Sequence, residues 1–66
     1  MWTVIYMTQN VKIAKQVYSL LTREGLMVKI DELDKLSDKN KLFYEILVLE
    51  SEAEEAQVIL LEHMNL

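Results

Sequence analysis

The chain contains no cysteine, no proline and a single glycine. Without cysteine it can form no disulfide, no thiolate metal site and no cysteine nucleophile, so we expect a protein of the reducing cytoplasm. With one glycine it has no glycine-rich loop to cradle a phosphate, and therefore no nucleotide-binding fingerprint. Few glycine and proline residues, together with a hydrophobic fraction of 52%, argue against disorder. We predict one folded domain, residues 1–66.

Long apolar runs and excess positive charge are also missing. No stretch approaches the roughly 18 apolar residues of a membrane span, and the segment "MWTVIYMTQN" lacks the positively charged start of a signal peptide. We expect a soluble, unprocessed chain with no membrane partner. The net charge of −4 would repel phosphates, so we expect no nucleic-acid partner either. Charge is uneven, because residues 9–25 are net positive and residues 50–63 are net negative.

The first part of the chain has the patterns of a strand and a helix. The segment "WTVIYMT", Trp2–Thr8, is rich in aromatic and β-branched residues and predicts a strand. A helix with one apolar face is predicted from about Val11 to Glu24, and Thr8 or Asn10 supplies its N-cap oxygen. Gly25 is expected to end this helix because glycine adopts a positive φ at little cost.

Two more strands are predicted after the glycine. Side chains alternate between apolar and polar over Leu26–Asp31, which is the period of a half-buried strand. The charged segment Glu32–Lys41 reads as an exposed connection. The segment Phe43–Glu50 is apolar on both sides except at Glu45, as expected for a central strand that is covered on two faces.

An acidic cluster lies where the third strand gives way to a second helix. Ser51 and Glu54 have the spacing of a capping box, in which each side chain accepts from the other residue's backbone amide. Acidic residues also interact favourably with the positive end of a helix dipole. A metal site is the weaker interpretation, since the carboxylates of Glu52, Glu54 and Glu55 would diverge around the helix. The predicted inner face of the second helix comprises Ala53, Ala56, Ile59, Leu60 and Met64.

The element order is therefore β-α-β-β-α. If both helices cover one face, the rules for crossover connections place the third strand between the first two, antiparallel to both. This predicts an α+β, ferredoxin-like fold with a three-stranded antiparallel sheet in the order 1-3-2, lacking the last strand of the full fold.

No arrangement of side chains predicts catalysis, a cofactor or a metal. His63 has no metal-ligating residue three or four positions before it, and we expect it at the partly covered edge of the core. The serines have no paired base and orienting acid, so we predict that the chain is not an enzyme. Lys29 is expected to pair with Glu45 across strands. The start of the first helix, with Thr8, Asn10 and Lys12, offers a weak anion-binding site.

The more telling feature is apolar surface that the predicted helices cannot cover. If they pack on the Ile46 and Val48 side of the third strand, then its other apolar residues face outward with Met27. The first strand adds either Trp2 and Tyr6 or Ile5 and Met7, and its edge is unpaired. We predict a homodimer, or binding to another protein, through this face or edge. The predicted interface comprises Trp2, Ile5, Tyr6, Met7, Met27, Leu47, Leu49, Val58 and Leu61.

Three further patterns carry a resemblance to a known family. They are "WTVIY" at residues 2–6, "IAKQVYSLLTREGLMVKI" at residues 13–30 and "EILVLESEAEEAQVILLE" at residues 45–62. Across nearly the whole chain these resemble the small domains described as prokaryotic signal-transducing proteins. The resemblance implies a compact α+β fold similar to ferredoxin-like and nitrogen-regulatory (PII-like) domains. It favours a non-enzymatic regulatory or interaction module, with a sensor of amino-acid-like or anionic small molecules as the alternative and a small enzyme as the second alternative.

Overall fold

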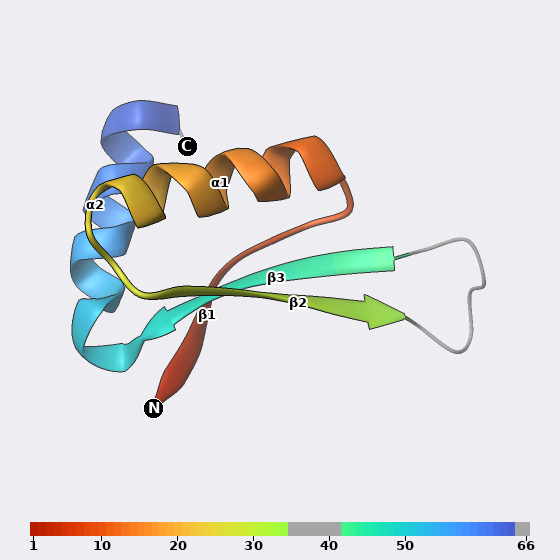
Figure 1. Cartoon of the computed structure of the whole chain (residues 1–66), viewed down its shortest axis with the longest axis horizontal. Helices are drawn as coiled ribbons and strands as arrows, with labels where there is room; N and C mark the ends of the chain where they lie inside the picture. Colours follow the sequence, from red (N-terminus) through yellow and green to blue (C-terminus); the bar gives the residue numbers. More distant parts are fainter. Residues whose placement is uncertain (35–41, 65–66) are drawn as a thin grey trace.

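The computed structural model of the chain describes residues 1–34 and 42–64 and has the predicted element order. Its sheet has three strands in the order β1-β3-β2, and β3 pairs antiparallel with both neighbours. In Figure 1, α1 lies along one side of the sheet and α2 stands at the end of the sheet where β3 finishes. The ferredoxin-like prediction is thus confirmed. The elements are β1 (Trp2–Thr8), α1 (Val11–Arg23), β2 (Val28–Asp34), β3 (Leu42–Leu49), the 3-10 turn η1 (Glu50–Glu52) and α2 (Ala53–Met64).

The helix α1 begins and ends as its sequence predicts. The Asn10 side chain accepts from the backbone amides of Lys12 at 2.9 Å and Ile13 at 3.2 Å, so Asn10 is the N-cap. At the other end Gly25 has a φ of 92°. Its amide donates to the Thr22 carbonyl, and the amide of Leu26 donates to the Leu21 carbonyl, which together form a Schellman motif. Leu26 and Leu21 are both buried, so this turn also anchors the chain to the core.

The second strand starts and finishes later than the sequence predicts. It covers Val28–Asp34 in place of Leu26–Asp31, because Leu26 is used in the helix-ending turn. Glu32 and Leu33 were predicted to begin an exposed connection, but they pair with Tyr44 and Phe43 of β3. Polar residues tolerate this position because one side of an edge strand faces solvent. The rest of the predicted connection, residues 35–41, lies outside the described part of the chain.

The predicted capping box at the start of the second helix is wrong. Ser51 lies inside the 3-10 turn η1, and Leu49 precedes this turn in an extended conformation without a side-chain cap hydrogen bond. The helix α2 begins only at Ala53. Glu52 has a tertiary role that the sequence did not reveal: its Oε1 accepts from the backbone amide of Met27 at 3.2 Å. This bond joins the start of α2 to the start of β2.

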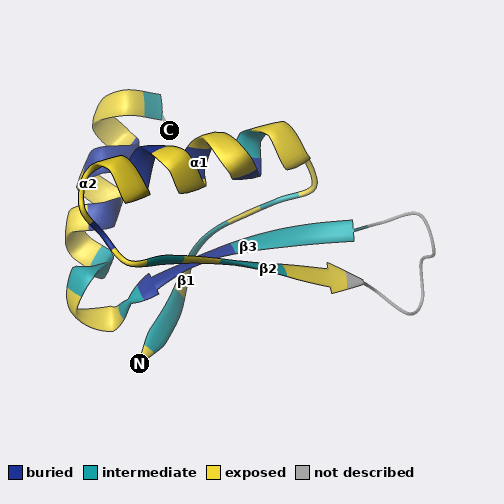
Figure 2. Cartoon of the chain, viewed as in Figure 1, coloured by how far each residue is buried: buried dark blue, intermediate teal, exposed yellow. Residues whose placement is uncertain are grey.

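The core lies between the two helices and one face of the sheet. Figure 2 shows the buried residues on the facing sides of α1 and α2 and on β3. Burial of each large apolar side chain contributes about 1.5–3 kcal/mol to folding. The buried cluster comprises Ala14, Val17, Leu20 and Leu21 of α1, Leu26, Ile46 and Val48 of the sheet side, and Ala56, Ile59 and Leu60 of α2.

A β-bulge in β1 changes which side chains reach this core. The register with β3 shifts between Val4 and Tyr6, so Ile5 is an extra residue with no partner of its own. Both Ile5 and Tyr6 pack against the core, whereas strict alternation would send one of them to the opposite face. Met7 then lies opposite Glu45, whose side chain is on the outer face of the sheet. Relative to strict alternation from Val4, the bulge therefore moves Tyr6 to the helix side and Met7 to the outer face.

Candidate interaction surface

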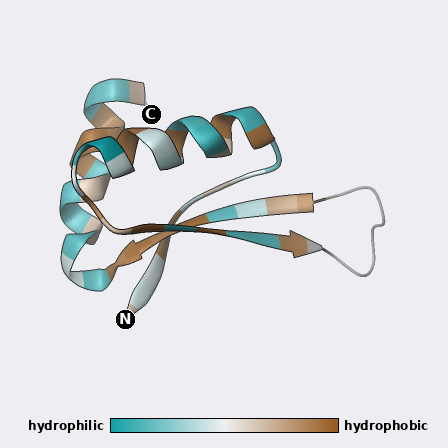
Figure 3. Cartoon of the chain, viewed as in Figure 1, coloured by the Kyte–Doolittle hydropathy of each residue, from teal (hydrophilic) through white to brown (hydrophobic). Residues whose placement is uncertain are grey.

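The face of the sheet opposite the helices carries many apolar side chains. Ile46 and Val48 of β3 point into the core, so their neighbours Leu47 and Leu49 point to the outer face. Figure 3 shows that β3 is hydrophobic over its C-terminal part, next to the helices. The register places further side chains on the same outer face, namely Trp2, Val4 and Met7 of β1 and Lys29, Asp31 and Leu33 of β2.

The middle of this outer face is covered by the chain itself. Leu47 is only 9% exposed although no helix lies over it. The Nζ atom of Lys29 lies 5.0 Å from the centroid of the Trp2 ring, a cation–π distance. Lys29 belongs to β2 and Trp2 to β1, so this contact spans β3, where Leu47 is the direct partner of Lys29. The Lys29–Trp2 contact thus shields Leu47 from water.

This contact also corrects an expected ion pair. Lys29 was predicted to lie across from Glu45, but the residue opposite Glu45 is Asp31. The prediction is wrong because the register of β2 with β3 pairs Lys29 with Leu47, two residues further along β3. Two carboxylates now face each other on the outer face, an arrangement that costs stability.

The residues predicted as an interface fall into several groups. Met7 is exposed at the outer face, Met27 is exposed just before β2, Trp2 and Leu49 are half-buried at the outer face, and Leu47 is buried there. Ile5 and Tyr6 are on the helix side of the sheet, because of the bulge, and pack against the core. Val58 and Leu61 are exposed on α2. The structure therefore separates one predicted patch into an outer-face part and a part beside α2.

The open edge of β1 presents backbone hydrogen-bonding groups. The amide of Glu50 donates to the Met1 carbonyl oxygen at 2.8 Å. In an antiparallel ladder such a bond flanks a pair that is not directly hydrogen-bonded, here Trp2 with Leu49. Because backbone groups alternate in direction along a strand, those of Trp2 and Val4 face away from β3. Among the described residues no strand pairs with this edge.

A small apolar groove lies between β1 and α2. Its volume is about 210 Å³, and it is lined by Ile5, Tyr6, Gln57, Leu60 and Leu61. The two β1 residues reach it because the bulge turns both of them toward the helices. Sequence reasoning missed this groove, since nothing in the pattern of β1 locates the bulge. The one hint in the sequence was that Val58 and Leu61 are apolar although they lie off the predicted inner face of the second helix.

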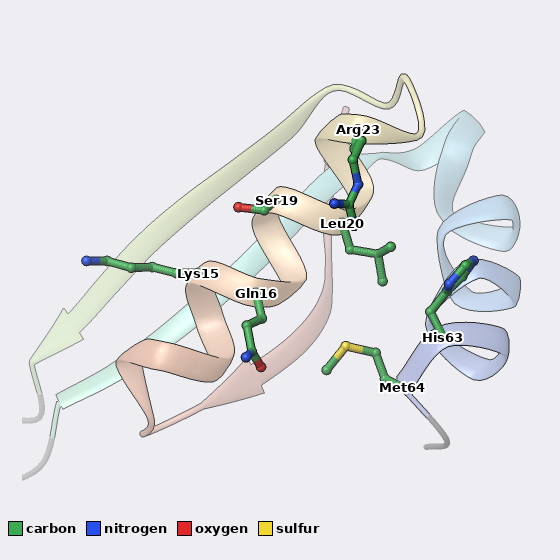
Figure 4. A pocket seen from close by; sticks show the side chains of 7 residues that line it. All are labelled: Lys15, Gln16, Ser19, Leu20, Arg23, His63 and Met64. Atoms are coloured by element: carbon green, nitrogen blue, oxygen red, sulfur yellow. The ribbon is translucent and has the colours of Figure 1, made fainter.

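A larger, more polar groove lies between α1 and the last turn of α2. It has a volume of about 530 Å³ and is lined by Lys15, Gln16, Ser19, Leu20, Arg23, His63 and Met64. Figure 4 shows Gln16, Arg23 and Met64 reaching toward the space between the helices, while Lys15 and Ser19 point away from it. His63 is exposed here, so its predicted place at the partly covered core edge is wrong.

The predicted anion site at the start of α1 has its amides already engaged. Thr8 Oγ1 accepts from the amide of Asn10 at 3.0 Å, and the Asn10 side chain accepts from the amides of Lys12 and Ile13. An anion would have to displace the Asn10 carboxamide from these donors. Anion binding at Thr8, Asn10 and Lys12 therefore stays a prediction, and the local geometry gives it no added support.

Neither a metal-ligand cluster nor a membrane-spanning helix is present in the described ranges 1–34 and 42–64. No group of three or more acidic, histidine or cysteine side chains in these ranges is placed to hold a metal ion. None of the helices there has the length and apolar character needed to cross a membrane.

Comparison with protein-family models gave no match, and neither the curated proteins nor the solved structures contain a significant one. The resemblance to signal-transducing domains therefore stays a prediction from the residues.

Proposed function

We propose that this chain is a non-enzymatic interaction module of the cytoplasm that acts as a homodimer and has a regulatory role. One observation supports the proposal most: apolar side chains and an unpaired strand edge lie outside the reach of the chain's own helices. Val4, Met7 and Leu33 are exposed on the outer sheet face, and Met27 is exposed just before β2. Leu61 is exposed at the groove beside β1, and Val58 is exposed one turn earlier on α2. Exposed apolar patches mark protein-interaction sites in other proteins.

The size of the chain gives a second reason for a partner. A domain near this length buries only about 60% of the surface of its unfolded chain, so its own core leaves it marginally stable. Burial of further apolar surface in a dimer adds stability that rises with protein concentration. The regulatory role rests on the family resemblance, and the non-enzymatic character rests on the lone histidine and the unpaired serines of the sequence.

Sedimentation equilibrium over a range of protein concentrations tests this function. The expected result is a shift of the average mass from 7.8 kDa toward twice that value as concentration rises. A chain that remains monomeric up to about 1 mM would contradict the proposal, because an affinity weaker than that amounts to less than about 4 kcal/mol of binding free energy.

The polar groove favours a second candidate, a sensor of small anionic molecules. Arg23 reaches into it above the apolar Leu20 and Met64, a combination suited to a small carboxylate with an apolar body. A thermal-shift series with amino acids and other small carboxylates tests this role. Bound ligand at a hundred times its dissociation constant raises the free energy of unfolding by about 2.7 kcal/mol. Arg23→Ala should abolish the response, whereas Lys12→Ala, which alters a cation of α1 outside the groove, should preserve it.

A further inference from the structure

The β1 edge and the exposed side of α2 form one continuous surface. The groove that joins them is lined by Ile5 and Tyr6 from the strand and by Gln57, Leu60 and Leu61 from the helix. Leu61 is exposed at its rim, and Val58 is exposed one turn earlier on the same helix. The strand supplies free backbone groups at Trp2 and Val4, and the helix supplies apolar side chains next to them. A partner that pairs with the strand must also meet α2.

We propose that this surface binds a second copy of the chain, with the two β1 edges antiparallel and the two α2 helices packed against each other. The inference rests on the proposed homodimer and selects the β1 edge over the outer sheet face. A two-fold axis perpendicular to the sheet brings β1 against β1 and keeps the helices of both copies on the same side. Leu61 of each copy then enters the groove of the other, since it already lies at the rim of its own.

The composition of α2 fits this arrangement. Its inner side is buried through Ala56, Ile59 and Leu60, yet it also carries Val58 and Leu61 on the side that faces solvent in one copy. A helix that is apolar on more than its core face is expected to be covered by something else. Packing α2 antiparallel to its copy separates the acidic first turns, Glu54 and Glu55, from each other.

The size of the surface is that of a small specific interface. Such interfaces use about 20–30 residues and about 800 Å² on each side. The strand β1 has 7 residues and the helix α2 has 12, of which Ala56, Ile59 and Leu60 are buried in the chain's own core, so the surface lies just below that range. The bulge divides the regular ladder of β1 into two short parts, Trp2–Val4 and Tyr6–Thr8, and the helix contacts must therefore provide much of the binding energy.

Two matched variants separate this edge from the outer sheet face. Leu61 and Met27 are both 58% exposed, but Leu61 is on α2 beside the edge and Met27 precedes β2 on the far side of the sheet. We expect Leu61→Glu to raise the dimer dissociation constant at least about tenfold, because the dimer would bury an unpaired charge. Met27→Glu should leave the constant within about twofold, since exposed substitutions away from an interface have little effect. Circular dichroism of both variants checks that the fold is retained.

The outcomes distinguish this inference from the proposed function. Weakening by Leu61→Glu alone supports the edge dimer. A comparable loss in Met27→Glu, or no loss in Leu61→Glu, overturns the edge geometry while the homodimer itself remains. A wild-type chain that is monomeric throughout overturns both.

Hydrogen exchange gives an independent readout of the same geometry. The Val4 amide faces the open edge, so it should exchange rapidly in dilute protein and at least about tenfold more slowly where the dimer is populated. An exchange rate that stays constant while the mass doubles overturns the pairing of the β1 edges.

Discussion

The two edges of the sheet are built differently. Each edge strand pairs only with β3 in the described part of the chain. The strand β2, Val28–Asp34, carries four charged residues, Lys29, Asp31, Glu32 and Asp34, whereas β1, Trp2–Thr8, carries none. Charged side chains on an edge discourage pairing with another chain. One edge of the sheet is therefore protected by charge, and the other is left able to accept a strand.

The two helices differ in their exposed residues in the same way as the two edge strands. The helix α1, which contacts both edge strands, presents mainly charged and polar residues such as Lys15 and Gln16 to solvent, although Val11 and Tyr18 are exposed at 42% and 38%. The helix α2 contacts β1 and β3, and it exposes Val58 and Leu61. Apolar exposure therefore accumulates beside the uncharged edge.

The largest expected loss of stability comes from truncating Ile46 in the central strand β3, which pairs with both edge strands. Ile46 is fully buried, and β3 pairs with β1 and β2 at this residue. Ile46→Ala should lower the free energy of unfolding by about 2–5 kcal/mol, because it removes buried methyl groups and leaves a cavity. Urea denaturation measures this loss. Leu33→Ala, at an exposed site of β2, serves as the control and should cost far less.

The contrast between the edges can be removed by placing a charge on β1. Val4 and Leu33 are 42% and 41% exposed, and both lie on the outer face of an edge strand. Val4→Lys should weaken self-association about tenfold, which is about 1.4 kcal/mol, because a lysine on an edge opposes strand pairing. Leu33→Lys adds the same charge to the already charged β2. If sedimentation equilibrium showed that the two variants weaken self-association equally, the two edges would not differ in their ability to pair with a second copy.

The connection that leads from α1 into β2 contains a residue with a positive φ, whereas no such residue leads into β1. Gly25 has a φ of 92°, and a Cβ atom added there would meet nothing within 4 Å. The cost of Gly25→Ala is therefore conformational, about 1 kcal/mol, without a steric clash. Thermal and urea unfolding measure the change. An unchanged stability would mean that this turn adopts another conformation in solution.

The smallest expected effect concerns the contact that links the two edges. Lys29→Ala removes the cation over Trp2 and uncovers Leu47, at an expected cost of about 0.5–1 kcal/mol. Trp2 is the only tryptophan, so its fluorescence reports the change directly. Lys15→Ala, on the solvent side of α1, is the control for loss of one positive charge. Identical emission spectra for Lys29→Ala and the wild type would exclude the contact in solution.

Most of the fold could be predicted from local patterns in the sequence. The same helix, α1, is indicated by its apolar period, by its N-cap Asn10 and by Gly25 at its end. The order of elements then restricts the topology to few choices. The end of β2 could not be predicted, because Glu32 and Leu33 adopt a strand only through pairing with β3. The capping box failed for a similar reason: a 3-10 turn occupies the position where Ser51 was expected to cap a helix.

The candidate site was harder to predict than the fold. The sequence identified Leu61 and Val58 as apolar residues off the core face, and both are exposed. It could not show that a bulge turns Ile5 and Tyr6 toward α2, since a bulge has no fixed sequence pattern in this strand. It also could not show that Lys29 crosses β3 to reach Trp2, because that contact depends on the register of three strands.

The central claim is that the uncharged β1 edge and the exposed side of α2 bind a second copy. Sedimentation equilibrium of the wild type and of Leu61→Glu, from about 1 μM to about 1 mM protein, tests it most directly. We expect the wild-type mass to rise from 7.8 kDa toward twice that value, while the variant remains near the monomer mass over most of the range. Superimposable curves for the two proteins would contradict it.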